Sequence, residues 1–140
     1  MIITIVNGPN LNLLGKREKH IYGDMSFEDY LIKLRDEFPG IDLRYFQSNV
    51  EGQIIEAVQK AAAEGGGIIL NAAGYTHTSV SIADAVAASG APVVEVHISN
   101  ILAREEYRHK SLIAPHCRGS LFGFGLDGYR LAIEALFKIL

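Results

Sequence analysis

Short hydrophobic runs alternate along the chain with longer stretches in which hydrophobic residues recur at helical spacing. The first run, residues 2–6, is β-branched and almost continuous, as in a strand that a parallel sheet buries on both faces. The stretch 26–38 instead places Phe27, Leu31 and Leu34 on one helical face. The whole pattern predicts strands at 2–6, 42–47, 68–71, 92–97 and 119–124, and helices at 26–38, 51–64, 79–89, 102–107 and 127–140.

This order of elements defines the expected fold class. Strands that alternate with helices favour right-handed βαβ crossovers and a parallel sheet covered on both faces. At 140 residues, the best match is an α/β, flavodoxin-like, doubly wound five-stranded sheet with strand order 2-1-3-4-5. No linker, repeat or charge block divides the chain, so residues 1–140 are expected to form a single catalytic domain.

Polar residues follow three of the predicted strands. They occur at 7–12 after the first strand, at 71–78 after the third and at 97–100 after the fourth. The polar residues of any one segment are explained by the turns and helix caps that such residues commonly form. However, the carboxyl ends of parallel strands meet at one edge, and ligands bind there at the switch in strand order. The three segments together therefore favour a small-molecule site.

Composition narrows the class of partner. There are 13 Lys and Arg against 16 Asp and Glu, for a net charge of −3, which argues against nucleic-acid binding through bulk positive charge. No apolar run reaches the roughly 20 residues of a membrane span, and no signal peptide is visible. The single cysteine, Cys117, suits a reducing cytoplasm. We therefore expect a cytoplasmic protein with no nucleic-acid or membrane partner.

Two pairs of residues are candidates for proton transfer. The connection 8–25 is long for a strand-to-helix link, and it carries Arg17 and Tyr22; such a loop is typical of a lid, and the arginine would favour the ionised phenol. His97 ends a strand two residues after Glu95, on the same face, where a carboxylate can orient it as a general acid. The ordinary alternatives are a solvated loop and a core histidine.

Several other chemistries lack their motifs. The chain has no Gly-x-Gly-x-x-Gly, no phosphate-binding Walker loop and no Gly-x-Ser-x-Gly elbow, and its histidines and lone cysteine lack metal-ligand spacing. No lysine ends a strand, so a Schiff-base nucleophile is not evident. A flavin-binding or receiver-type signalling module of the same fold remains the alternative, although it lacks a phosphate loop and acidic strand ends.

Motifs in order along the chain resemble type II 3-dehydroquinate dehydratases. They are residues 7–18 (NGPNLNLLGKRE), 22–23 (YG), 47–52 (QSNVEG), 71–79 (NAAGYTHTS), 84–85 (DA), 95–100 (EVHISN) and 104–105 (RE). The resemblance covers essentially the whole chain. It implies reversible dehydration of 3-dehydroquinate to 3-dehydroshikimate, in the shikimate or the quinate pathway, without a cofactor or metal. It also implies a homo-oligomer, a dodecamer built as four trimers.

The resemblance also implies a role for each matching residue. Tyr22 resembles the general base, Arg17 the lid arginine that assists it, and Asn10 the residue that helps to hold the enolate. His97 resembles the general acid, with Glu95 beside it. The positions that bind the hydroxyls and carboxylate of the substrate are matched by Asn71, His77, Ile98, Ser99 and Arg108, whereas Asp84 matches a residue that reaches the site of a neighbouring subunit.

Overall fold

The computed structural model describes residues 1–16 and 18–140, and Arg17 lies outside these ranges. The strands are β1 (Ile2–Asn7), β2 (Asp42–Gln47), β3 (Gly67–Asn71), β4 (Val93–His97) and β5 (Gly119–Phe122). The helices are α1 (Lys19–Tyr22), α2 (Phe27–Glu37), α3 (Glu51–Glu64), α4 (Val80–Ala88) and α5 (Asp127–Ile139). Short 3-10 turns are η1 (Leu11–Leu13), η2 (Ala73–His77), η3 (Ile101–Ala103), η4 (Glu106–Arg108) and η5 (Ala114–His116).

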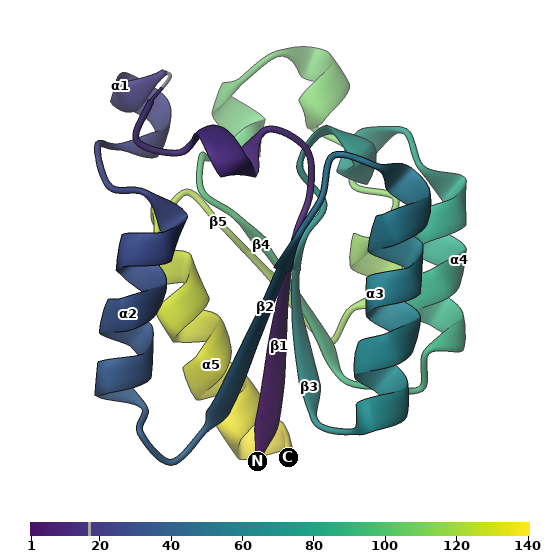
Figure 1. Cartoon of the computed structure of the whole chain (residues 1–140). Coiled ribbons are helices and arrows are strands. Elements are labelled where there is room, and N and C mark those ends of the chain that lie inside the picture. Colours follow the sequence, from purple (N-terminus) through teal and green to yellow (C-terminus); the bar gives the residue numbers. More distant parts are fainter. Residues whose placement is uncertain (17) are drawn as a thin grey trace.

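The five strands form one parallel sheet in the order β2-β1-β3-β4-β5, which confirms the predicted fold class and topology. Helices α2 and α5 cover one face, and α3 and α4 cover the other (Figure 1). The strand order reverses between β1 and β3. The carboxyl ends of these two strands therefore mark the place where this fold binds ligands.

One predicted helix is wrong. Residues 102–107 do not form a continuous helix, because Arg104 and Glu105 have extended ψ angles of −164° and 146° that separate η3 from η4. Conversely, the long connection after β1 contains the short helix α1, which hydrophobic spacing did not reveal.

Buried hydrophobic residues lie on both faces of the sheet. β1 and β3 contribute to both layers because their side chains alternate between faces, as the near-continuous hydrophobic runs predicted. Helix α2 begins where Ser26 Oγ accepts a hydrogen bond of 3.2 Å from the Asp29 backbone N–H, the cap expected from its sequence. The helices therefore anchor the strands whose ends carry the polar segments.

The loops after β1 and β3 touch through backbone. The Gly8 N–H donates a 2.8 Å hydrogen bond to the Asn71 carbonyl. A Cβ atom at Gly8 would lie 2.7 Å from the Ala72 carbonyl oxygen, so the approach requires glycine. Gln47 at the end of β2 donates to the Gly8 carbonyl at 3.1 Å. These contacts hold the three strand ends together as one polar edge.

Candidate active site

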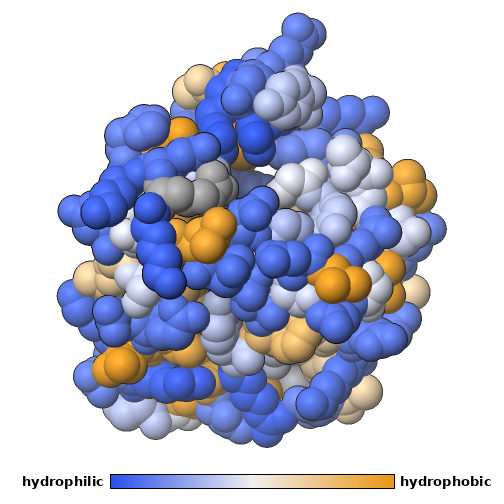
Figure 2. Space-filling model, turned by 45° about the horizontal axis from the view of Figure 1, so that its top comes forward, coloured by the Kyte–Doolittle hydropathy of each residue, from blue (hydrophilic) through white to orange (hydrophobic). Residues whose placement is uncertain are grey.

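A cavity opens at the carboxyl ends of β1, β3 and β4. Its volume is about 150 Å³, well above the roughly 10–15 Å³ that accommodates one water. The surrounding face is largely hydrophilic, with a hollow between the surrounding side chains (Figure 2). The residues that line the cavity are Pro9, Asn10, Leu11, Glu18, Tyr22, Asn71, Ala73, Gly74, His77, His97, Ile98, Ser99, Ile101, Arg104 and Arg108.

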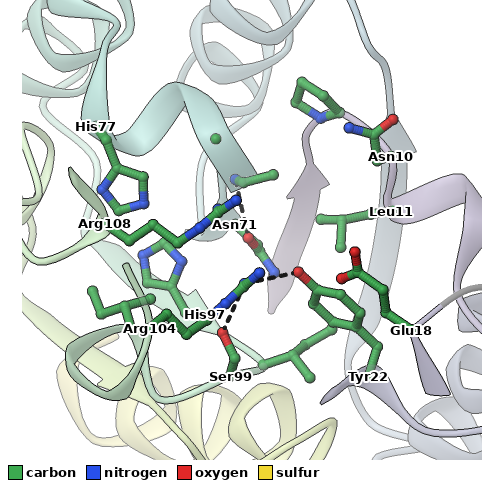
Figure 3. Close-up of a pocket in the computed structure, with 15 residues that line it drawn as sticks. Asn10, Leu11, Glu18, Tyr22, Asn71, His77, His97, Ser99, Arg104 and Arg108 are labelled. Carbon is green, nitrogen blue, oxygen red and sulfur yellow. Dashed lines mark hydrogen bonds between the residues drawn. The ribbon is translucent and has the colours of Figure 1, made fainter. Parts of the chain in front are cut away.

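Tyr22 lies at one side of this cavity against Arg104 (Figure 3). The Arg104 Nη1 group donates a hydrogen bond of 2.9 Å to the Tyr22 hydroxyl and another of 3.3 Å to Ser99 Oγ. The guanidinium carbon is also 5.7 Å from the centre of the Tyr22 ring. A cation that donates to a phenol oxygen favours the ionised form of that oxygen. The structure therefore provides Tyr22 with a cationic partner from the loop after β4.

Sequence reasoning did not assign this role to Arg104. It gave the tyrosine's cationic partner as Arg17, which lies outside the described residues. Glu18 was also missed as a residue that lines the cavity. The available signal was the position of Arg104 shortly after His97, the last residue of β4.

His97 faces the cavity from the end of β4 and is held from behind by Glu95. Its Nε2 atom is 2.7 Å from Glu95 Oε2, and both side chains are buried. Burial raises the pKa of Glu95, but hydrogen bonds from His97, Ser111 and Ser120 outweigh it and hold that pKa below the usual value. Because the carboxylate only accepts, His97 Nε2–H is the donor, and Nδ1 is the ring nitrogen left for other contacts.

His77 lines the cavity beside His97, and their rings stack with centres 6.3 Å apart. The Nδ1 atom of His77 lies 2.8 Å from the Lys110 carbonyl oxygen, which can only accept, so Nδ1 carries the proton. Burial lowers the pKa of His77, and the nearby charge of Arg108 lowers it further. Neutral His77 then offers Nε2 as an acceptor, which suits a hydroxyl better than an anion.

Asn71 lines the cavity, and a buried network of amide and hydroxyl groups orients its side chain. Its Nδ2 atom donates to the Tyr129 hydroxyl at 2.8 Å, and that hydroxyl donates to Asn7 Oδ1 at 2.8 Å. Its Oδ1 atom accepts from the Ala73 N–H at 3.1 Å. Tyr129, on α5, therefore bridges the ends of β1 and β3 and fixes the orientation of the Asn71 amide.

The remaining predicted residues fall into two groups. Asn10, Ile98, Ser99 and Arg108 all line the cavity, as expected of a shared site. Asp84 does not, because it lies on the exposed face of α4, one turn from the 64% exposed Val80. Among the described residues, every predicted site residue except Asp84 and Glu95 lines the cavity. Glu95 lies directly behind His97 and contacts its ring.

Within residues 1–16 and 18–140, no three or more His, Cys, Asp or Glu side chains gather in a way that could hold a metal ion. In the same part of the chain, no helix is long and apolar enough to cross a membrane.

A tyrosine beside a cation and a histidine beside a carboxylate therefore face one cavity (Figure 3). The first pair suits proton abstraction and the second suits proton donation, because the guanidinium donates to the oxygen that would take a proton and the carboxylate orients the imidazole that would give one. Such an arrangement can remove a proton from one atom of a small molecule and deliver one to another.

Comparisons with known proteins agree with this geometry. The family model described as Dehydroquinase class II matches residues 1–137. A 3-dehydroquinate dehydratase of Nitratiruptor sp. is 48% identical over 99% of this chain and 90% of its own length. One from Campylobacter jejuni is 51% identical, with coverage of 99% and 89%. The crystal structure of a type II dehydroquinase from Butyrivibrio crossotus superposes with a TM-score of 0.92 at 46% identity, covering 98% of this chain and 97% of that one.

Proposed function

The chain belongs to the class II dehydroquinase family and is a hydro-lyase that converts 3-dehydroquinate to 3-dehydroshikimate, and we propose that Tyr22 and His97 perform the two proton transfers of this reaction. The reaction is a step of the shikimate pathway. The observation that carries the proposal is the placement of the two side chains, each with an oppositely charged partner, on the lining of one cavity. The flavin-binding or receiver-type alternative is not favoured by the family match.

Tyr22 acts as the base. Its phenolate oxygen, stabilised by the Arg104 guanidinium at 2.9 Å, takes a proton from the carbon next to the ketone. The electron pair moves onto the ketone oxygen to form an enolate, which needs hydrogen-bond donors already in place. Asn10 is the proposed donor, through a water. Its loop is held by a 2.9 Å hydrogen bond from the Asn10 N–H to Asn49 Oδ1.

His97 acts as the acid. As the enolate collapses, the C–O bond to the departing hydroxyl breaks and His97 Nδ1–H protonates that oxygen, releasing water. Glu95 accepts a hydrogen bond of 2.7 Å from Nε2, which leaves Nδ1 as the ring nitrogen that delivers the proton. No imine forms in these reaction steps. Within the described part of the chain, no lysine lines the cavity.

The other residues of the cavity bind the substrate. Arg108 and the backbone N–H groups of Ile98 and Ser99 are proposed to hold the carboxylate, since charge-assisted bonds are strong and directional. His77 Nε2 accepts from a substrate hydroxyl, because its Nδ1 proton is committed to the Lys110 carbonyl. The Asn71 amide, oriented by Tyr129, binds a second hydroxyl.

Two further predicted residues, Arg17 and Asp84, belong to the proposed site. We propose Arg17, which lies outside the described residues, as the lid arginine that assists Tyr22, and Asp84 as a residue that reaches a neighbouring subunit's site. Its exposed position on α4, one turn from the exposed Val80, supports that placement. The proposed assembly is a dodecamer built as four trimers. Light scattering tests it by measuring the mass of the protein in solution. A cytoplasmic location is proposed from the single, half-buried Cys117.

The direct test uses 3-dehydroquinate and the absorbance of the conjugated enone product. The folded protein should generate this absorbance without any added cofactor. Treatment with borohydride in the presence of substrate should leave activity and protein mass unchanged, because no imine is available for reduction. Absence of enone from pure, folded protein would overturn the proposal, and substrate-dependent inactivation by borohydride would overturn the enolate route.

A further inference from the structure

Two serines outside the cavity lining bind the carboxylate behind His97. Ser111 Oγ donates a 2.7 Å hydrogen bond to Glu95 Oε2, the same oxygen that accepts from His97 Nε2. Ser120 Oγ donates a 2.5 Å hydrogen bond to the other oxygen, Oε1. The Glu95 side chain is only 1% exposed. Each carboxylate oxygen therefore has a hydroxyl donor, and the imidazole occupies a third, defined direction.

The fold brings these serines to Glu95 from two separate segments. Ser120 lies on β5, where the parallel register pairs it directly with Glu95 on β4. Ser111 lies between η4 and η5, and its hydroxyl also accepts a 3.0 Å hydrogen bond from the Ala114 N–H. The Ala114 bond holds the Ser111 oxygen beside Glu95, and the hydroxyl proton is donated to the carboxylate. The Ser111 donor is thus oriented before any substrate arrives.

We propose that Ser111 and Ser120 are positioning residues that hold the Glu95 carboxylate so that His97 presents Nδ1 to the substrate. This inference rests on the proposed role of His97 as the general acid. A carboxylate without its two hydroxyl donors can rotate, and it can also take a proton and donate to Nε2. Either change removes the acceptor that keeps the His97 proton on Nε2.

Other charged groups around the pair do not replace these hydroxyls. His77 stacks on His97 from η2 but is itself bound to the Lys110 carbonyl. Arg108 lines the cavity and pairs with Glu105 at 2.7 Å. Cys117 lies within the field of Glu95, and burial raises the pKa of its thiol to about 12, so it stays neutral. The two serines donate to the buried Glu95 carboxylate without carrying charge, and they add to the larger effect of His97 in holding the pKa of Glu95 below its usual value.

Matched substitutions separate the hydroxyl from the shape of the side chain. Ser120→Thr and Ser120→Val have nearly the same shape and suit a strand, but only the threonine keeps a hydroxyl donor. Ser111→Thr and Ser111→Ala form the second pair. Ser89→Ala is the control, because Ser89 Oγ donates at 2.8 Å to the Val86 carbonyl at the end of α4, away from the cavity.

Two readouts on the full-length enzyme test the proposal. Nitrogen-15 NMR of histidine-labelled protein at pH 8, with the His97 signals assigned by a His97→Asn variant, reports which ring nitrogen carries the proton. We expect a single Nε2–H tautomer in wild type, both threonine variants and Ser89→Ala, and a mixture in Ser111→Ala and Ser120→Val. In Ser111→Ala and Ser120→Val we expect kcat to fall about tenfold and KM to change less than twofold. This is the effect expected when one hydrogen bond to a charged group is lost.

A wild-type tautomer in Ser111→Ala and Ser120→Val overturns the proposal, and so does an unchanged kcat. Threonine variants that lose kcat as fully as the variants without a hydroxyl also overturn it, since the shape of the side chain would then be responsible. If the wild-type protein does not dehydrate 3-dehydroquinate, the proposed function fails. The tautomer comparison still decides whether the serines orient His97.

Discussion

Arg104 and Tyr22, 82 residues apart in the chain, are joined by a 2.9 Å hydrogen bond from guanidinium to phenol oxygen at the wall of the cavity. The bond is charge-assisted, and in the reaction its acceptor carries the negative charge of the base. Ser99 receives a second hydrogen bond from the same Nη1 atom, which ties the tyrosine to the end of β4. The two proton-transfer groups are thus linked through one short loop.

Arg104→Gln should lower kcat about 100-fold while substrate binding changes little. The glutamine can still donate a hydrogen bond, but it supplies no charge to favour the phenolate, and hydrogen bonds to charged groups contribute about 1.5–3 kcal/mol. Steady-state kinetics give kcat and KM, and calorimetry gives binding. Arg130→Gln is the control, because Arg130 pairs with Asp127 on the surface of α5. A kcat within threefold of wild type would remove Arg104 from the mechanism.

His77→Asn should raise KM about tenfold with a smaller effect on kcat. The asparagine amide can still donate to the Lys110 carbonyl in place of Nδ1, but it lacks the acceptor at Nε2. Because burial lowers the pKa of His77, the wild-type side chain remains an acceptor until the pH falls below that lowered pKa. KM should therefore rise on acidification in wild type more than in His77→Asn. Parallel pH dependence of KM in the two proteins would contradict this role.

Glu95→Gln should destabilise the protein by about 1–3 kcal/mol at neutral pH, because a buried acceptor of three hydrogen bonds is altered. The pKa of Glu95 in the folded state is below its ordinary 4.5. Its contribution is therefore present above about pH 4.5 and is lost as the pH falls through the folded-state value. Urea unfolding between pH 6 and 3 should show the difference from wild type narrowing, with exposed Glu106→Gln as the control. A difference that does not change with pH would show that Glu95 is not held as an anion.

Tyr129→Phe should cost about 1–3 kcal/mol of folding stability and should raise KM. Its buried hydroxyl donates to Asn7 and accepts from Asn71, and both amides lose a partner when it is removed. Tyr30→Phe is the matched control, since the Tyr30 hydroxyl is buried without a hydrogen-bond partner among the described residues. Thermal and urea unfolding measure the stability. Equal effects of the two substitutions would rule out the bridging role of Tyr129.

Hydrophobic periodicity was enough to predict the sheet and its four long helices. The runs at 2–6 and 68–71 favoured buried strands, and the number and order of the predicted elements favoured the strand order that the structure has. The pattern failed at 102–107, where backbone angles at Arg104 and Glu105 break the helix. Those angles place Arg104 against Tyr22, a tertiary requirement that local spacing does not encode.

The candidate site was predicted where its residues share a strand end, and was missed where distant segments meet. Asn71 and His97 follow from strand order alone, because parallel strands end at one edge. Arg104, 82 residues from Tyr22, could not be paired with it from spacing. Ser120 reaches Glu95 through the register of β4 and β5, which a sequence without an alignment does not define.

Separate roles for Tyr22 and His97 are the central claim, and deuterium incorporation into 3-dehydroquinate tests it most directly. Proton NMR in D2O follows exchange at the carbon next to the ketone alongside formation of the enone. Tyr22→Phe should bind substrate but catalyse neither process above the buffer background. His97→Asn should lose dehydration while exchange continues, because the enolate still forms. Exchange at the wild-type rate in Tyr22→Phe, or loss of exchange together with dehydration in a folded, substrate-binding His97→Asn, would contradict the assignment.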